Sequence, residues 1–162
     1  MITRHILLSC LLLPCSFANA GGYVFSPNFC DFSVEFPVQY KPKEMILKGT
    51  HGAGATAHPN SATSLGAECW PYEQQLSINT YAQGLEDEMR QRGVIINSVL
   101  IDNDGGVSPQ VILTGRISVG GNMLTIKTVS FIGPRSRLDL TILDRYMVSQ
   151  TQVSFRNSVY KK

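Results

Sequence analysis

The chain has 162 residues, 43% hydrophobic and 16% charged, with 14 basic and 12 acidic side chains and a formal net charge of +2. This near-neutral balance argues against nucleic-acid binding, which usually requires a strongly basic face. A bilayer-spanning helix needs about 20 apolar residues, and no segment after position 20 meets that requirement. We therefore expect a protein without a transmembrane segment.

Residues 1–20 are typical of a secretory signal peptide. Arg4 lies in a charged start, residues 6–17 are almost wholly apolar, and the small-x-small site Ala18-Asn19-Ala20 follows. We expect cleavage near Ala20 and export to the periplasm or out of the cell. Lipidation at Cys10 or Cys15 is the alternative prediction.

The segment after the signal, residues 21–162, has a length that suits one domain with its own core. Arg4 is the only basic residue in the signal, so this segment keeps 13 basic and 12 acidic residues, a net charge of +1. It also keeps two cysteines, Cys30 and Cys69. In an exported domain such a pair predicts a disulfide, whereas two free buried thiols are the alternative.

The first elements in chain order are strands. Apolar and polar residues alternate over Cys30–Phe36, which predicts a half-buried strand, and Glu44–Leu47 is a second short candidate. Residues 49–66 are rich in Gly, Ala, Ser and Thr and lack apolar periodicity, so we expect a long flexible loop there. Strand character returns over Glu68–Tyr81.

Two helices are expected, one before and one after a series of strands. The first spans Gln83–Arg92, with Glu-to-Arg pairs at i,i+4 spacing and Gly93 after its end. The second spans Asp144–Tyr160, which has apolar residues at four-residue spacing.

Between these helices the sequence predicts an antiparallel meander. Val94–Ile101 is apolar on both faces, as in a central strand, and three alternating segments follow, separated by Gly-rich or Gly-Pro turns. The helices on either side of the meander need a sheet face to cover. The predicted class is therefore α+β, with a central antiparallel sheet flanked by helices.

The opening strand CDFSVEFP resembles the F-x-V-x-F-P start of PsbP-like domains, including their bacterial DcrB-like branch. VSFIGPRSRLDLTI at 129–142 resembles the last hairpin of that family, and FRNSV at 155–159 resembles its terminal helix. The resemblance covers about residues 28–160. It implies an α/β/α sandwich and a role as a binding or assembly subunit, and it supplies no catalytic motif.

Two histidines in the Gly-rich segment, His51 and His58, are weak candidates for a metal site. Zinc sites usually need three or four ligands, and only Glu68 and Cys69 follow nearby. We therefore expect two solvated histidines, no bound metal and no cofactor.

Acidic residues gather at two places. Asp102 and Asp104 precede two glycines but lack the later acids of a calcium loop, so a hairpin turn is expected. Residues 86–88 are all acidic, and two of the three are explained by the i,i+4 arginines, so a solvated helix face is expected.

Four residues are candidates for binding a partner. Trp70 and Tyr72 directly follow Cys69, so a disulfide would hold both aromatic rings in place, although burial in the core is the alternative. Arg135 and Arg137 share one face of the predicted sheet and form a basic pair, with Arg116 and Lys127 elsewhere in the meander.

These patterns favour an exported, non-enzymatic binding module, an accessory or assembly factor for a protein complex of the cell envelope. The alternative is a small-ligand or metal-binding protein that uses the His51–His58 segment. An enzyme is disfavoured, because no nucleophile, base and orienting group are seen together. The sequence leaves open the identity of the partner, the oligomeric state and the choice between periplasm and secretion.

Overall fold

The computed structural model describes residues 22–47, 49–72, 74, 77–104, 106–145 and 150–162, and the side chains of 150–152 are left out. The predicted signal peptide and its alternative lipidation sites lie outside these residues. The described strands are β1 (Tyr23–Phe25), β2 (Phe32–Phe36), β3 (Lys41–Leu47), β4 (Thr50–Asn60), β5 (Thr63–Pro71), β6 (Ile95–Asp102), β7 (Gln110–Val119), β8 (Asn122–Ile132), β9 (Ser136–Asp144) and β10 (Val159–Lys161). The described helices are α1 (Ile78–Gln91) and α2 (Gln150–Asn157).

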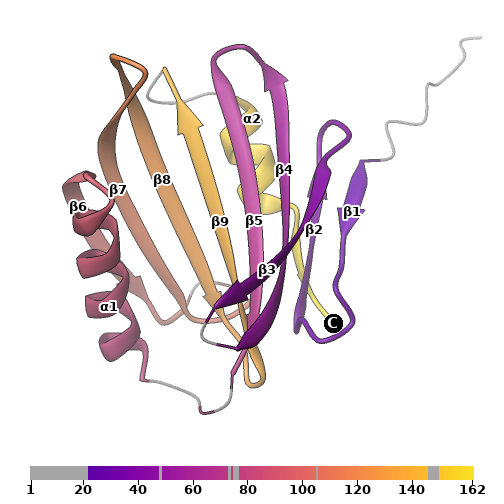
Figure 1. The fold of residues 1–162 in the computed structure, drawn as a ribbon. Helices are drawn as coiled ribbons and strands as arrows, with labels where there is room; N and C mark the ends of the chain where they lie inside the picture. The colour runs from indigo at the N-terminus through magenta and orange to yellow at the C-terminus, as the bar shows by residue number, and fades with distance from the viewer. Residues whose placement is uncertain (1–21, 48, 73, 75–76, 105, 146–149) are drawn as a thin grey trace, which may run out of the picture.

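The strands form two antiparallel sheets (Figure 1). The larger has the order β3-β4-β5-β9-β8-β7-β6, and the smaller has the order β1-β2-β10. Within the larger sheet, β6 to β9 pair in sequence as the expected meander. β9 then pairs with β5, which joins the meander to the β3-β4-β5 hairpins.

Each face of the larger sheet has its own core. Side chains of β4, β5, β8 and β9 pack with β2, β10 and Phe155 of α2, so the small sheet and α2 cover one face. On the other face, Tyr81, Leu85 and Met89 of α1 pack against β6, β7 and β8. The antiparallel sheet of the prediction is present, but the layer opposite α1 is a second β-sheet together with α2.

The prediction of a flexible loop over residues 49–66 is wrong. β4 covers Thr50–Asn60 and β5 begins at Thr63, with a register shift between Ala57 and Asn60. Glycine and alanine give a strand almost no side-chain pattern, so the usual periodicity of two cannot be seen. Here their small size lets neighbouring layers approach the sheet, and Ala55 and Ala57 are buried in the core.

The boundary after β5 also differs from the prediction. β5 ends at Pro71 and α1 begins at Ile78, so the strand expected over Glu68–Tyr81 stops ten residues early and the helix starts five residues early. Ser77 caps the helix by accepting a hydrogen bond from the Thr80 N–H at 3.2 Å. A serine is a common N-cap residue of a helix, but the alternation of apolar and polar residues at 76–79 favoured the prediction of a strand.

Two further elements are placed differently. β6 is an edge strand rather than a central one, and it leaves Ile95 and Leu100 more than half exposed. The last helix is shorter than predicted, because α2 ends at Asn157 and Val159 lies buried in β10 beside Val34. Residues 146–149 of the predicted helix lie outside the described residues.

Candidate functional site

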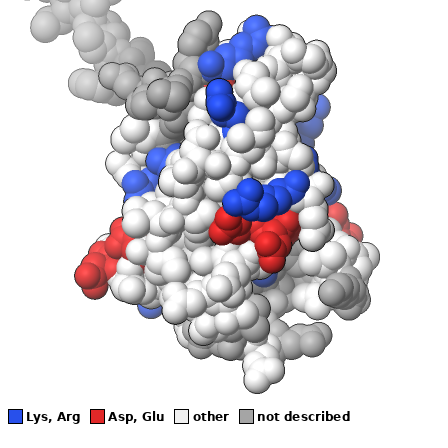
Figure 2. All heavy atoms as spheres, turned by 90° about the vertical axis from the view of Figure 1, so that its left-hand side faces the viewer, with Lys and Arg blue, Asp and Glu red and all other residues white. Residues whose placement is uncertain are grey.

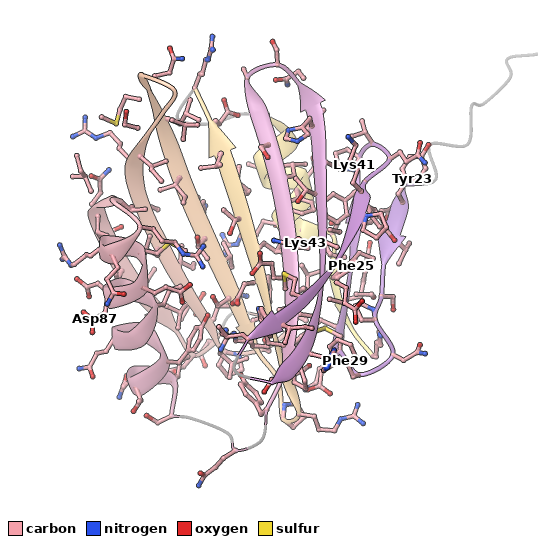
Figure 3. All side chains as sticks on the ribbon, viewed as in Figure 1. Tyr23, Phe25, Phe29, Lys41, Lys43 and Asp87 are labelled. Atoms are coloured by element: carbon pink, nitrogen blue, oxygen red, sulfur yellow. A yellow bond between two sulfur atoms is a disulfide. The ribbon has the colours of Figure 1, made fainter. Side chains whose placement is uncertain are left out.

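A groove of about 800 Å³ lies on the α1 face of the larger sheet, between α1 and β3. Figure 3 labels Lys43 on β3 and Asp87 on α1, and these two elements lie on opposite sides of the groove. The side chain of Asp87 points away from the sheet. The floor comes from β5, β8 and β9, and its residues are Glu68, Trp70, Thr128, Arg137, Asp139 and Thr141. We call this space the α1–β3 groove.

Glycines on β4 help to form the hollow. Gly52 and Gly54 share the groove face of β4, and neither has a side chain to fill it. The six-membered ring of Trp70 lies over Gly52, where an added Cβ would come within 2.6 Å of the ring. The sulfur of Met45 lies over Gly54, where an added Cβ would come within 3.0 Å of the sulfur. The segment expected to be a loop therefore supplies a flat surface on which Trp70 rests.

Strand register brings the polar floor residues together. In the pairing of β5 with β9, Trp70 lies opposite Arg137 and Glu68 lies opposite Asp139. In the pairing of β8 with β9, Thr128 lies opposite Thr141. Directly opposed residues have Cβ atoms about 4.5–5.5 Å apart, so these side chains form one continuous polar surface.

One half of this surface is an internally satisfied network. The Tyr81 hydroxyl donates to Asp139 Oδ1 at 2.7 Å and lies 2.9 Å from the Ser130 hydroxyl. Arg137 Nε donates to Asp139 Oδ2 at 3.0 Å, and its guanidinium lies 5.1 Å from the centre of the Tyr81 ring. Burial raises the pKa of Tyr81 well above its ordinary value, and the Asp139 carboxylate raises it further. Tyr81 is therefore a neutral hydrogen-bond donor that fixes α1 to the sheet.

The other half of the surface has polar groups without partners. Thr128 is 1% exposed, and its hydroxyl has no hydrogen-bond partner. It is the one such buried side-chain group found among the described residues. The structure also gives the Glu68 carboxylate no hydrogen bond or ion pair in the part of the chain it describes, although it lies opposite another carboxylate. Buried polar groups are normally paired, so an unpaired group at the floor of a groove needs an explanation.

Of the four residues predicted to bind a partner, Trp70 and Arg137 meet at the groove. Tyr72 lies next to them and is partly buried, and burial raises its pKa to about 12. Its backbone N–H donates to the carbonyl of Arg135 at 2.9 Å. The predicted disulfide is confirmed, with Cys30 and Cys69 joined and their Cα atoms 6.0 Å apart. Cys69 lies in the core between Glu68 and Trp70, so the bond holds the strand that carries them.

Arg135 bonds to a different carboxylate from Arg137, which is bonded to Asp139. The Nε of Arg135 donates to Asp31 Oδ1 at 2.9 Å, and its backbone N–H donates to Asp31 Oδ2 at 2.7 Å. The backbone N–H of Ser136 also donates to Oδ2, at 2.8 Å. Burial alone would raise the pKa of Asp31, but the hydrogen bonds from Arg135 and Ser136 hold it below its ordinary value. Arg135 thus fixes the turn before β9 to the small sheet.

The two histidines cannot share a metal ion. Both lie exposed on β4, seven residues apart, which corresponds to roughly 23 Å along a strand. His51 Nδ1 lies 3.5 Å from Glu44 Oε1, and both side chains are mostly exposed. No group of three or more His, Cys, Asp or Glu residues suited to a metal occurs among the described residues. The idea that both histidines close over one ligand is therefore wrong.

Several of the remaining charged candidates have structural partners. Arg90 and Arg92 pair with Glu86 and Glu88 on α1, as predicted. Asp102 accepts a hydrogen bond from the backbone N–H of Asp104 at 3.1 Å, as expected for a turn. Lys127 lies on the opposite face from Arg137, where burial and Arg156 lower its pKa. Arg116 is exposed on β7.

Sequence reasoning missed four of the groove residues, Glu68, Tyr81, Thr128 and Asp139. Each was assigned to a strand or helix, and polar residues on alternate positions of a strand usually mean a solvent face. A sheet register was needed to show that these positions meet on one surface under a helix. The available signal was a tyrosine on the apolar stripe of α1, since a buried tyrosine usually needs a hydrogen-bond partner.

Comparison with known protein families and with curated protein sequences finds no significant match for this chain. Within the described ranges, no helix is both long and apolar enough to cross a membrane.

Proposed function

We propose that this protein is an exported, non-enzymatic binding module and that the α1–β3 groove is its binding site. The observation that carries the proposal is the groove itself, which is about 800 Å³ in volume and is lined by Trp70 and by the Glu68 carboxylate, an acceptor without a hydrogen bond or ion pair in the part of the chain that the structure describes. A bound molecule that donates a hydrogen bond to Glu68 would use that acceptor.

Export is supported by two independent features. The first is the signal-like composition of residues 1–20. The second is the Cys30–Cys69 disulfide, because disulfides persist in oxidising compartments such as the periplasm and the extracellular space. We propose that the mature protein acts in one of these compartments.

A binding role fits the groove better than catalysis does. Asp139 and Arg137 are paired with each other and with Tyr81, so neither is poised as a free acid or base. The two described histidines lie on β4 and do not line the groove. The resemblance of residues 28–160 to PsbP-like and DcrB-like domains favours the same role, as an accessory or assembly factor in the cell envelope.

The proposal is tested by cross-linking in the native envelope. A photo-activatable residue replaces Leu47, which is 54% exposed at the groove rim, and in a matched control it replaces Val24, which is 57% exposed on the small sheet. We expect a discrete cross-linked product from position 47 and none from position 24. Equal labelling from both positions, or a product from position 24 alone, would contradict the assignment of the groove.

A further inference from the structure

The chemistry of the α1–β3 groove also indicates what it binds, and this inference rests on the proposed function. We propose that the ligand is an uncharged, hydroxyl-rich molecule, a short oligosaccharide. Trp70 provides the surface on which a sugar ring stacks, and Glu68, Thr141 and Arg137 provide its hydrogen bonds.

The charge of the groove argues against a strongly charged ligand. Its lining contains three basic and four acidic residues, namely Lys43, Arg92, Arg137, Glu44, Glu68, Glu88 and Asp139. Four of these are already paired with a neighbour of opposite charge, Arg92 with Glu88 and Arg137 with Asp139. Figure 2 shows the same mixture on the α1 side, where basic and acidic side chains lie against one another across the middle of the face. An anionic polymer would find no excess of positive charge here.

The hydrogen-bonding groups require a ligand that both donates and accepts. The Glu68 carboxylate accepts only, whereas Arg137 donates only and uses Nε on Asp139, which leaves its terminal nitrogens as further donors. The Thr141 hydroxyl does both. An ammonium group would satisfy Glu68 but not Arg137, and a carboxylate would do the reverse. Hydroxyl groups satisfy all three residues.

A peptide strand fits this surface less well. Peptides that add to a sheet use the unpaired backbone groups of an edge strand. The edge strand β3 forms one side of the groove, but the floor is the face of β5, β8 and β9, whose backbones are paired on both sides. Recognition at the floor must therefore come from side chains, and these are an aromatic ring and a set of polar groups.

Trp70 has the position that a stacking residue needs. Its ring lies over Gly52, so the sheet supports one side of the indole, and the residue lines the groove. The face of an aromatic ring carries partial negative charge, which attracts the slightly positive C–H groups on the face of a sugar ring. A groove of about 800 Å³ falls within the usual range for a small-molecule site, about 300–1,000 Å³.

The first experiment is a screen of the full mature protein on an array of neutral and charged oligosaccharides, with titration calorimetry on each hit. Three variants are compared with the parent: Thr141→Val, Glu68→Gln and, as a matched control, Thr125→Val. Thr125 is on β8, next to the β9 strand that carries Thr141, but it is on the opposite face of the sheet and does not line the groove.

We expect a neutral oligosaccharide to bind, and Thr141→Val and Glu68→Gln each to weaken its affinity about 3- to 10-fold, as loss of one hydrogen bond implies. Thr125→Val should leave affinity unchanged. If Thr141→Val does not fold, the variant Glu68→Gln, at a partly exposed position, still tests the site. Oligosaccharide binding that is unaffected by the groove variants would overturn the inference.

The two proposals can fail separately. If no neutral oligosaccharide binds but position 47 cross-links to a protein, the glycan inference is overturned and the binding-module proposal stands. If no oligosaccharide binds and position 47 gives no product, both are overturned.

Discussion

One face of the seven-stranded sheet carries buried apolar side chains such as Leu138, Leu140 and Val129, whereas the other face carries Arg137 and Asp139 on the same β9 strand. The first face is covered by the small sheet and α2 and is held by the disulfide. The second is covered by α1 over β6 to β8 and left as a groove over β5 and β9. Both faces therefore contribute an apolar core to stability, and the part of the second face left open over β5 and β9 is the one that we propose for binding.

The largest expected effect is on the apolar face. Phe32 is fully buried on β2, and its ring centre lies 6.0 Å from that of Phe131 on the larger sheet. Phe32→Ala should lower the free energy of unfolding by about 3–5 kcal/mol, because it removes buried surface and leaves a cavity. Urea denaturation measures this change. Val24→Ala, at an exposed position on the same small sheet, should change stability by less than about 0.5 kcal/mol.

The disulfide is the next largest contribution. Cys30 and Cys69 are separated by 39 residues, so the bond should stabilise the fold by about 4 kcal/mol in the chain-entropy model. The double variant Cys30→Ser, Cys69→Ser should show this loss in a denaturant titration, and reduction of the parent protein should reproduce it. A reduced protein as stable as the oxidised one would mean that the bond does not hold β5 in place.

A smaller and pH-dependent effect is expected at Asp31. Because its folded pKa lies below the unfolded value, the stability that its charge provides is fully present above the unfolded pKa of about 3.9. That stability is lost as the pH falls through the folded pKa. Asp31→Asn should cost about 1–3 kcal/mol at pH 7. Melting temperatures from pH 7 to pH 2 should show the difference between variant and parent narrowing in acid, and a constant difference would argue against the ionised carboxylate.

The smallest effects are expected on the groove face, where the substitutions should increase the stability of the free protein rather than decrease it. Thr128→Val removes an unpaired buried hydroxyl, and Glu68→Gln removes a like-charge pair with Asp139. Each should raise the stability of the free protein by up to about 1 kcal/mol. Thermal melts measure this, with Thr125→Val as the control. A clear loss of stability in both variants would mean that these residues serve the fold and would weaken the comparison between the two faces.

The sequence predicted the features that depend on neighbouring residues. The alternation of Phe32, Val34 and Phe36 identified β2, the turns identified the meander, and the cysteine count identified the disulfide. These signals are local, or in the case of the disulfide follow from there being one pair. The resemblance to PsbP-like domains stays a prediction.

The remaining features depend on contacts between distant segments. Nothing near Ile95 indicates that β6 lies at an edge, and nothing near Gly52 indicates that Trp70 rests on it. The groove could not be predicted because it results from the pairing of β5 with β9, which sets Glu68 against Asp139 across a long stretch of chain. A sequence pattern records which side of a strand a residue is on, but not which strand lies next to it.

The pairing of β2 with both β1 and β10 has a consequence for how the chain folds. The Ser158 hydroxyl donates to the carbonyl of Glu35, 123 residues away, and Asp31 is bonded to Ser136, 105 residues away. Closing such long loops is slow, and topologies dominated by distant contacts fold in milliseconds to seconds. During synthesis, β2 cannot pair with β10 until residues 159–161 have been made. The small sheet is therefore among the last parts of the fold to be completed.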